Sequence, residues 1–134
     1  MTEQRVLPLT TDHDTAPFWA AAAEERLVVQ HCDDCDLPIH LPRGVCPRCH
    51  GERTSWREVR GAGRLHSWTV VEHQVHPGHP TPYTSVLVEL EDLPSVRFLG
   101  SLPGRLDLEI DQPMTVRFER VGDTTLPQWE PVSS

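Results

Sequence analysis

Lysine is absent from this sequence, whose 12 basic residues are all arginines. That absence excludes Schiff-base chemistry on lysine, a lysine general base and a phosphate-binding loop that depends on lysine. Aromatic residues make up 6% of the chain and hydrophobic residues 37%, below the roughly 45 to 50% usual in globular proteins. We therefore expect a modest hydrophobic core that needs an additional source of stability.

Hydrophobic runs long enough to cross a membrane are also missing, and the first residues lack the basic start and apolar stretch of a secretory signal. We therefore expect a soluble, cytoplasmic protein. In that reducing compartment, an even number of cysteines indicates metal binding rather than disulfides. The 20 acidic and 12 basic residues give a net charge of -8, which opposes binding to the phosphate backbone of nucleic acids.

The 13 prolines favour loops and short strands over long helices. One helix of about three turns is predicted after a cap at Asp14 or Thr15, with Pro17 in its first turn. The other elements are predicted as strands, because they are short apolar or alternating runs between turn residues. These strands cover residues 27–31, 65–76, 83–91, 96–101, 114–120 and a short final stretch at 126–129.

Alternation of apolar and polar residues is clearest near the C-terminus. It predicts a strand with Met114, Val116 and Phe118 on one buried face. Arg117 and Glu119 are then expected to face water. This pattern is typical of a sheet with one side packed on a core.

Four cysteines, Cys32, Cys35, Cys46 and Cys49, form two Cys-x2-Cys pairs separated by ten residues. Each pair can fold into a tight turn that presents two sulfurs to one ion, and ten residues suffice to bring the second turn opposite the first. Four thiolates give the closed tetrahedral site typical of structural zinc, with no position left for a water ligand. The sequence therefore predicts one structural zinc per chain and no zinc-dependent hydrolysis.

Other interpretations of the cysteines remain open: two disulfides, a redox-active pair, or iron held as in rubredoxin. Iron uses the same thiolate geometry, although no cluster or partner signal favours electron transfer. His31, His40 and His50 lie near the cysteines in sequence. Because four thiolates complete the ligand set, these histidines are expected to be exposed or to contact the ligands without binding the metal. Arg43 or Arg48 is expected to soften the charge of about -2 on the centre.

Several short strands after a cysteine-rich segment favour a small closed β-barrel, because closure removes unpaired sheet edges. We predict a mainly β protein that ends in a five-stranded OB-fold barrel, with an open sandwich as the alternative. The glycine-rich stretch 61–63 is expected to break the chain before the first barrel strand. The predicted organisation is an N-terminal segment with a helix (1–26), a rubredoxin-like zinc ribbon (27–59) and the barrel (60–134).

Residues for covalent catalysis are not found in the sequence once the cysteines are committed to metal. No serine lies in a Gly-x-Ser-x-Gly motif, and His73, His76 and His79 in a proline-rich loop are expected to be solvated rather than catalytic. The four tryptophans are expected to serve the core or an interface. Phe18 and Trp19 on the predicted helix are the candidates for binding another protein, because large aromatic residues dominate such contacts.

The order of these parts resembles a known family. A helix with Phe18 and Trp19, the four-cysteine segment, the run GAGRLHSWT at 61–69 and the closing LPQWEP at 126–131 are similar to proteins that combine a rubredoxin-like zinc ribbon with an OB-fold and are associated with acyl-CoA enzymes. The likeness covers residues 14–131. Members of that family assemble with thiolases, with thiolase-like aldolases that trim steroid side chains, and with hot-dog-fold enoyl-CoA hydratases.

The resemblance implies a non-catalytic accessory subunit in a hetero-oligomer, with the ribbon and leading helix docked on the partner and the barrel helping to enclose CoA. The partner would hold the catalytic residues. Arg60, Arg64, His66 and Trp68 are candidate CoA contacts, because arginine can clamp phosphate and tryptophan can stack on adenine. The alternative function is an OB-fold that binds single-stranded nucleic acid, which the acidic net charge disfavours.

Overall fold

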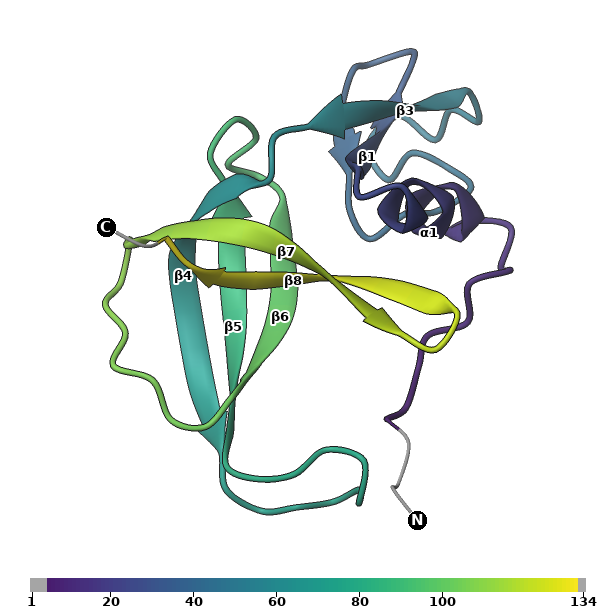
Figure 1. The fold of residues 1–134 in the computed structure, drawn as a ribbon. Helices are drawn as coiled ribbons and strands as arrows, with labels where there is room; N and C mark the ends of the chain where they lie inside the picture. The colour runs from purple at the N-terminus through teal and green to yellow at the C-terminus, as the bar shows by residue number, and fades with distance from the viewer. Residues whose placement is uncertain (1–4, 133–134) are drawn as a thin grey trace.

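The computed structural model describes residues 5–132, which form a mainly β protein with a leading helix, as predicted. The elements in chain order are α1 (Ala16–Ala23), β1 (Leu27–Cys32), β2 (Pro38–Ile39), β3 (Thr54–Val59), β4 (Ala62–Val71), β5 (Tyr83–Leu90), β6 (Arg97–Pro103), β7 (Pro113–Val121) and β8 (Thr124–Pro131). Helix α1 and the strands β1 and β3 lie on one side of the barrel formed by β4 to β8 (Figure 1). None of the helices in the described part of the chain is long and apolar enough to cross a membrane.

Helix α1 is shorter than predicted because it ends in a left-handed turn. It covers eight residues, and Thr15 precedes it without forming a side-chain cap hydrogen bond. Glu25 has a φ of 58°, and the N–H of Arg26 donates to the carbonyl of Ala21 over 2.9 Å. This closure reverses the chain so that β1 begins directly after it. The buried face of α1, which includes Phe18, packs on β1 and β8.

The smaller sheet has the order β2-β1-β3, with antiparallel neighbours on both sides of β1. All six residues of β1 are buried, so this strand is the centre of the ribbon. Strand β3 was not predicted, because its sequence TSWREV mixes charged and apolar residues without strict alternation. It nevertheless pairs with β1 over its whole length, from Leu27 opposite Val59 to Cys32 opposite Thr54.

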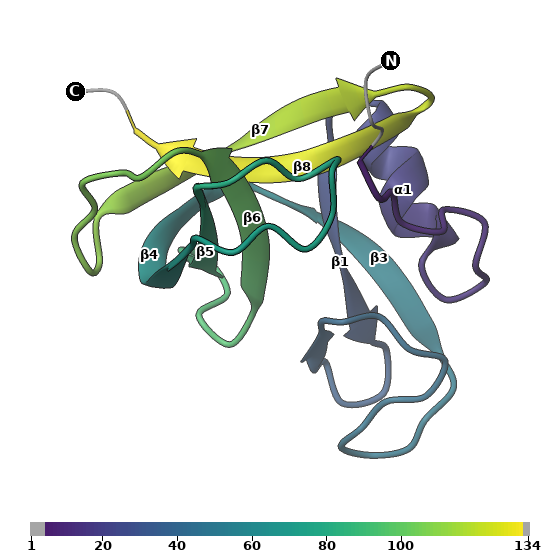
Figure 2. The same ribbon diagram turned by 90° about the horizontal axis from the view of Figure 1, so that it is seen from below.

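The larger sheet has the order β6-β5-β4-β7-β8 and closes into the predicted OB-fold barrel. Strands β7 and β8 cross over β4, β5 and β6 (Figures 1 and 2), and β6 lies close to β8. The Gln128 side chain joins these last two strands, because its Oε1 accepts the N–H of Ser101 over 2.8 Å. The barrel interior is filled by fully buried side chains, including Leu65, Met114 and Trp129.

Strand β4 begins and ends earlier than the predicted span 65–76. Gly61 forms the predicted bend before the first barrel strand, whereas the two residues after it already belong to β4. A Cβ atom on Gly63 would lie 2.5 Å from the carbonyl oxygen of Glu89, and one on Gly61 would lie 2.0 Å from Cγ1 of Val116. The two glycines therefore permit β5 and β7 to approach the start of β4 closely. The alternation predicted for β7 is present only in part: Met114 is buried and Val116 packs against the core, but the predicted water-facing residues Arg117 and Glu119 are half-buried as well.

Candidate metal centre

The metal centre is built from two turns with the same backbone hydrogen bonds. In each turn the N–H of the first cysteine, Cys32 or Cys46, donates to the carbonyl five residues later, and the N–H four residues later donates back to the carbonyl of that cysteine. All four bonds measure 2.9 Å. The residue that closes each turn, Asp36 or His50, has a positive φ of 62° or 64°. The repeated Cys-x2-Cys spacing thus reflects two copies of one local conformation.

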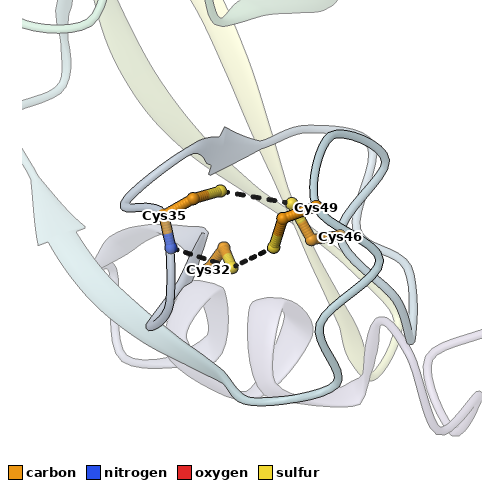
Figure 3. Close-up of side chains that lie close together, drawn as sticks. All are labelled: Cys32, Cys35, Cys46 and Cys49. Atoms are coloured by element: carbon orange, nitrogen blue, oxygen red, sulfur yellow. Dashed lines mark hydrogen bonds between the residues drawn. The ribbon is translucent and has the colours of Figure 1, made fainter.

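The four Sγ atoms converge on one point between the two turns, within 4.8 Å of one another (Figure 3). The Sγ atoms of Cys32 and Cys49 are 3.5 Å apart, and those of Cys35 and Cys46 are 3.6 Å apart. These separations are too long for disulfides, whose S–S bond is about 2.05 Å. A tetrahedral zinc site with bonds of about 2.3 Å has edges of about 3.8 Å between sulfurs. The donor set and its spacing therefore fit one zinc ion.

The metal centre is also the core of the ribbon. Cys32 and Cys46 are 0% exposed and pack with Ile39, whereas Cys49 reaches the surface. Apart from these cysteines the cluster holds few apolar side chains, too few to stabilise a segment of this length. Structural zinc is therefore the additional source of stability that a modest hydrophobic core needs.

Neighbouring charges and N–H groups shift the pKa values of Cys35, Cys46 and Cys49 unequally. The guanidinium of Arg48 is the main cause that lowers the pKa of Cys35 to about 6, and the backbone N–H groups of Cys49 and Arg48 lower the pKa of Cys46. The N–H of Gly51 acts to lower the pKa of Cys49, but its thiol neighbours and desolvation raise it to about 12. These three thiols therefore do not ionise equally easily without a cation, and a bound divalent ion stabilises the fully deprotonated ligand set.

The histidines near the cysteines in sequence do not belong to the sulfur cluster. His31 is buried, with its Nδ1 3.1 Å from the carbonyl oxygen of Val29, and His50 is exposed. Of the two arginines considered, Arg48 lies at the metal centre, whereas the backbone of Arg43 pairs with the side chain of Gln30. The prediction that cysteines alone form the ligand set agrees with this geometry.

His40 is neither exposed nor behind the metal ligands, but joins the ribbon to the barrel. Its ring centroid is 4.2 Å from that of Phe98 in β6 and 6.3 Å from that of Phe18 in α1. Phe98 in turn lies 6.1 Å from Phe18 and 6.0 Å from Trp129. We call Phe18, His40, Phe98 and Trp129 the aromatic bridge. Burial lowers the pKa of His40 to about 4, so its ring is neutral at physiological pH.

Comparison with known families assigns the ribbon and the barrel to two family models, whose border falls within β3. Residues 19–55 match the family described as ChsH2, rubredoxin-like zinc ribbon domain, and residues 56–119 match ChsH2, C-terminal OB-fold domain. A solved structure, the Ltp2-ChsH2(DUF35) aldolase, is 31% identical, with a TM-score of 0.82 over 92% of this chain and 98% of that one. This chain belongs to the ChsH2 family. The family resemblance and the structural zinc predicted from the sequence are both confirmed.

Two curated relatives of this ChsH2-family chain are named as hydratase subunits. The probable enoyl-CoA hydratase alpha subunit of Thermomonospora curvata is 32% identical over 90% of this chain and 38% of its own length. The 3-oxo-4,17-pregnadiene-20-carboxyl-CoA hydratase alpha subunit of Mycobacterium tuberculosis is 29% identical over 91% of this chain and 39% of its own length. The chain thus spans about two fifths of the length of these relatives.

Two of the four candidate CoA contacts in this ChsH2-family chain are engaged with acidic neighbours. Arg60 donates two hydrogen bonds of 2.8 Å to the carboxylate of Asp92. Arg64 donates to the carbonyl of Asp111 over 3.2 Å and lies 3.5 Å from a carboxylate oxygen of Glu91. Both guanidinium groups remain exposed, so a phosphate would have to compete with these acidic partners.

A β-bulge separates the other two candidates. The register of β4 against β5 shifts between Leu65 and Ser67, which leaves His66 as the extra residue on the exposed face. Trp68 consequently lies opposite buried Val86 and packs against the barrel core. A strict period of two would have placed His66 and Trp68 on the same face. The structure therefore does not gather the four candidates into one patch.

The two aromatic candidates for partner binding have different surroundings. Phe18 is 9% exposed and belongs to the aromatic bridge, so it offers little surface to another protein. Trp19 is half-buried, packs edge-on against Phe18 and lines an open groove of about 630 Å³. The same groove is lined by Leu99, which is 70% exposed, and by Leu126. Sequence patterns did not reveal this groove, because α1, β6 and β8 meet there only in the folded chain.

Proposed function

We propose that this chain is a non-catalytic accessory subunit of an enzyme that acts on acyl-CoA thioesters, with a thiolase-like aldolase or an enoyl-CoA hydratase as its partner. The observation that carries the proposal is the agreement with the Ltp2-ChsH2(DUF35) aldolase, in which 98% of the matched chain is covered at a TM-score of 0.82. The hydratase alpha subunits among its relatives support the same class of partner. Steroid side-chain degradation is the proposed pathway class, since one of these relatives is named for a pregnadiene-carboxyl-CoA substrate.

The chemistry of the described residues supports an accessory role. Four thiolates close the zinc site, so the metal has no free position for a substrate or a water molecule. In the proline-rich loop, His76 accepts the N–H of Gly78 through Nδ1, and His79 accepts the N–H of Val6 through Nε2. These bonds stabilise the loop and the N-terminal segment. The groups that activate the substrate are therefore expected to come from the partner.

The exposed positions Arg64 and His66 remain proposed contacts of CoA. Both lie on the outer face of β4, where a phosphate could reach them without disturbing the barrel core. Arg60 would first have to release Asp92, and Arg64 its weaker contacts with Glu91 and the carbonyl of Asp111. Trp68 is turned toward the core. A CoA site on this chain would therefore be small, and the partner would complete it.

The purified chain alone is expected to show no turnover of aldol or enoyl-CoA thioesters. When it is added to its partner, it should raise the partner's activity until the two are equimolar, because every binding site on the partner is then occupied. The measurement is a titration of the partner with this chain at fixed substrate. Steady turnover by the isolated chain, or a partner whose activity ignores it, would contradict the proposal.

Replacing Trp19 with alanine is expected to weaken the complex about 10- to 100-fold, because truncating a central aromatic contact typically costs a few kcal/mol. The dissociation constant can be measured by calorimetry with the partner that co-purifies after coexpression. Zinc content should stay unchanged. Trp68→Ala is the matched control, since Trp68 is also half-buried but faces the barrel core. Equal weakening by both changes would indicate a general loss of stability instead of a contact at Trp19.

A further inference from the structure

Arg48 contacts both turns of the metal centre. Its backbone N–H lies 3.4 Å from the Sγ of Cys46 in its own turn, in the geometry of an N–H to sulfur bond. Its guanidinium reaches across the site, where Nη2 donates to the carbonyl oxygen of Cys35 over 2.7 Å. A single residue therefore links the two halves of the zinc site through its main chain and its side chain.

The two turns differ in how firmly the rest of the fold holds them. The first turn, 32–35, lies between the paired strands β1 and β2. The second turn, 46–49, lies in the long connection between β2 and β3. The Gln30 side chain holds the start of that connection through the backbone of Arg43, and the N–H of Asp33 holds its end by donating to the carbonyl of Arg53 over 2.9 Å. The second turn lies between these two anchors, outside the paired strands, and its Cys49 is exposed. The second turn is therefore the half that can move away first.

Other arginines of the ribbon are bound to carboxylates of the first turn and its flank. Arg53 forms an ion pair with Asp34, and Arg57 lies 2.7 Å from a carboxylate oxygen of Asp36. Arg48 instead lies beside the thiols, which together with zinc carry a charge of about -2. Its positive charge offsets the negative charge of the zinc centre, and its hydrogen bond holds the two turns together, so both effects stabilise the closed site.

We propose that Arg48 is a positioning residue that ties the second turn to the first and so slows the loss of zinc. When its side chain is removed, the turn 46–49 keeps its own hydrogen bonds but loses its link to the carbonyl of Cys35. Opening of the site then becomes more frequent, and the exposed Cys49 is the first ligand that water or a competing chelator can reach. Mutation of residues that contact the metal ligands without binding the metal commonly changes metal affinity 10- to 100-fold.

The test is the rate of zinc transfer from the full-length zinc-loaded protein to the chromogenic chelator 4-(2-pyridylazo)resorcinol. Arg48→Met is expected to release zinc at least about 10-fold faster than the wild type. Arg57→Met is the matched control, because it removes the same charge from an exposed arginine of the ribbon that lies in β3, pairs with Asp36 and does not contact the second turn. It should release zinc at nearly the wild-type rate.

The cobalt-substituted proteins give a second measurement. The absorption spectrum of Arg48→Met should match that of the wild type, since the four sulfur ligands are unchanged. A wild-type rate of zinc release in Arg48→Met would overturn the proposal. Equal acceleration in Arg48→Met and Arg57→Met would overturn it too, because the effect would then be one of general charge. A changed cobalt spectrum would likewise contradict a bracing role, since Arg48 would then determine the ligand geometry itself.

Discussion

Replacing Cys46 with serine is expected to abolish tight zinc binding and to unfold the ribbon. Cys46 is fully buried and supplies one of four sulfurs, so a shorter and far less acidic hydroxyl leaves the tetrahedron open. Structural zinc contributes roughly 10 to 16 kcal/mol of apparent binding free energy in small domains of this kind. Metal analysis should show the ratio of zinc to protein falling from one toward zero, and hydrogen exchange should lose its protection in β1 to β3.

The control for this substitution is Val45→Ser. Val45 precedes Cys46, is 42% exposed and lies outside the sulfur cluster, so the variant should keep its zinc. A Cys46→Ser protein that retains one zinc per chain would show that the fourth ligand is dispensable. A wild-type protein that contains iron and is red, or one whose four cysteines are oxidised, would contradict the zinc assignment.

The second large effect expected is a loss of stability in mild acid caused by His40. Burial lowers its pKa from 6.5 to about 4 in the folded state. The unfolded chain therefore takes up a proton first as the pH falls. Stability due to this residue is complete above about pH 6.5, declines between pH 6.5 and 4 and is lost below about 4. The loss amounts to roughly 3 kcal/mol, because each pKa unit corresponds to about 1.4 kcal/mol.

The measurement is the free energy of unfolding by denaturant as a function of pH, compared between the wild type and His40→Phe. Phenylalanine preserves an aromatic ring against Phe98 but does not titrate. Protonation of the zinc thiolates also destabilises both proteins in acid, so the informative quantity is the difference between their curves. That difference should change by roughly 3 kcal/mol from pH 7 to 4. Parallel curves would mean that His40 titrates normally in the folded protein.

The parts of this protein that the sequence predicts well depend on local signals. The spacing of the two Cys-x2-Cys pairs favours two similar turns that present four sulfurs to one ion, and the apolar positions of β7 indicate which of its faces meets the core. The strands 83–91, 96–101 and 114–120 were each predicted to within a few residues of β5, β6 and β7. Each of these features is explained by residues that are close together in the sequence.

The features that the sequence did not predict depend on residues far apart in the chain. Strand β3 is stabilised by its pairing with β1 and not by its own composition. The bulge at His66 turns Trp68 to the core and so separates it from Arg64. Phe18 lies in α1 and His40 directly after β2, both far from Phe98 in the sequence, yet both pack on Phe98 in the fold.

The aromatic bridge affects how the ribbon and the barrel unfold. The matches to the two family models meet between residues 55 and 56, which suggests two separable modules. However, the ring of His40 from the ribbon and that of Phe18 from the helix both lie against Phe98 of the barrel. Cutting the chain at that border would expose these apolar surfaces on both fragments. We therefore expect the ribbon and the barrel to stabilise each other, so that the loss of zinc from the ribbon also weakens the barrel.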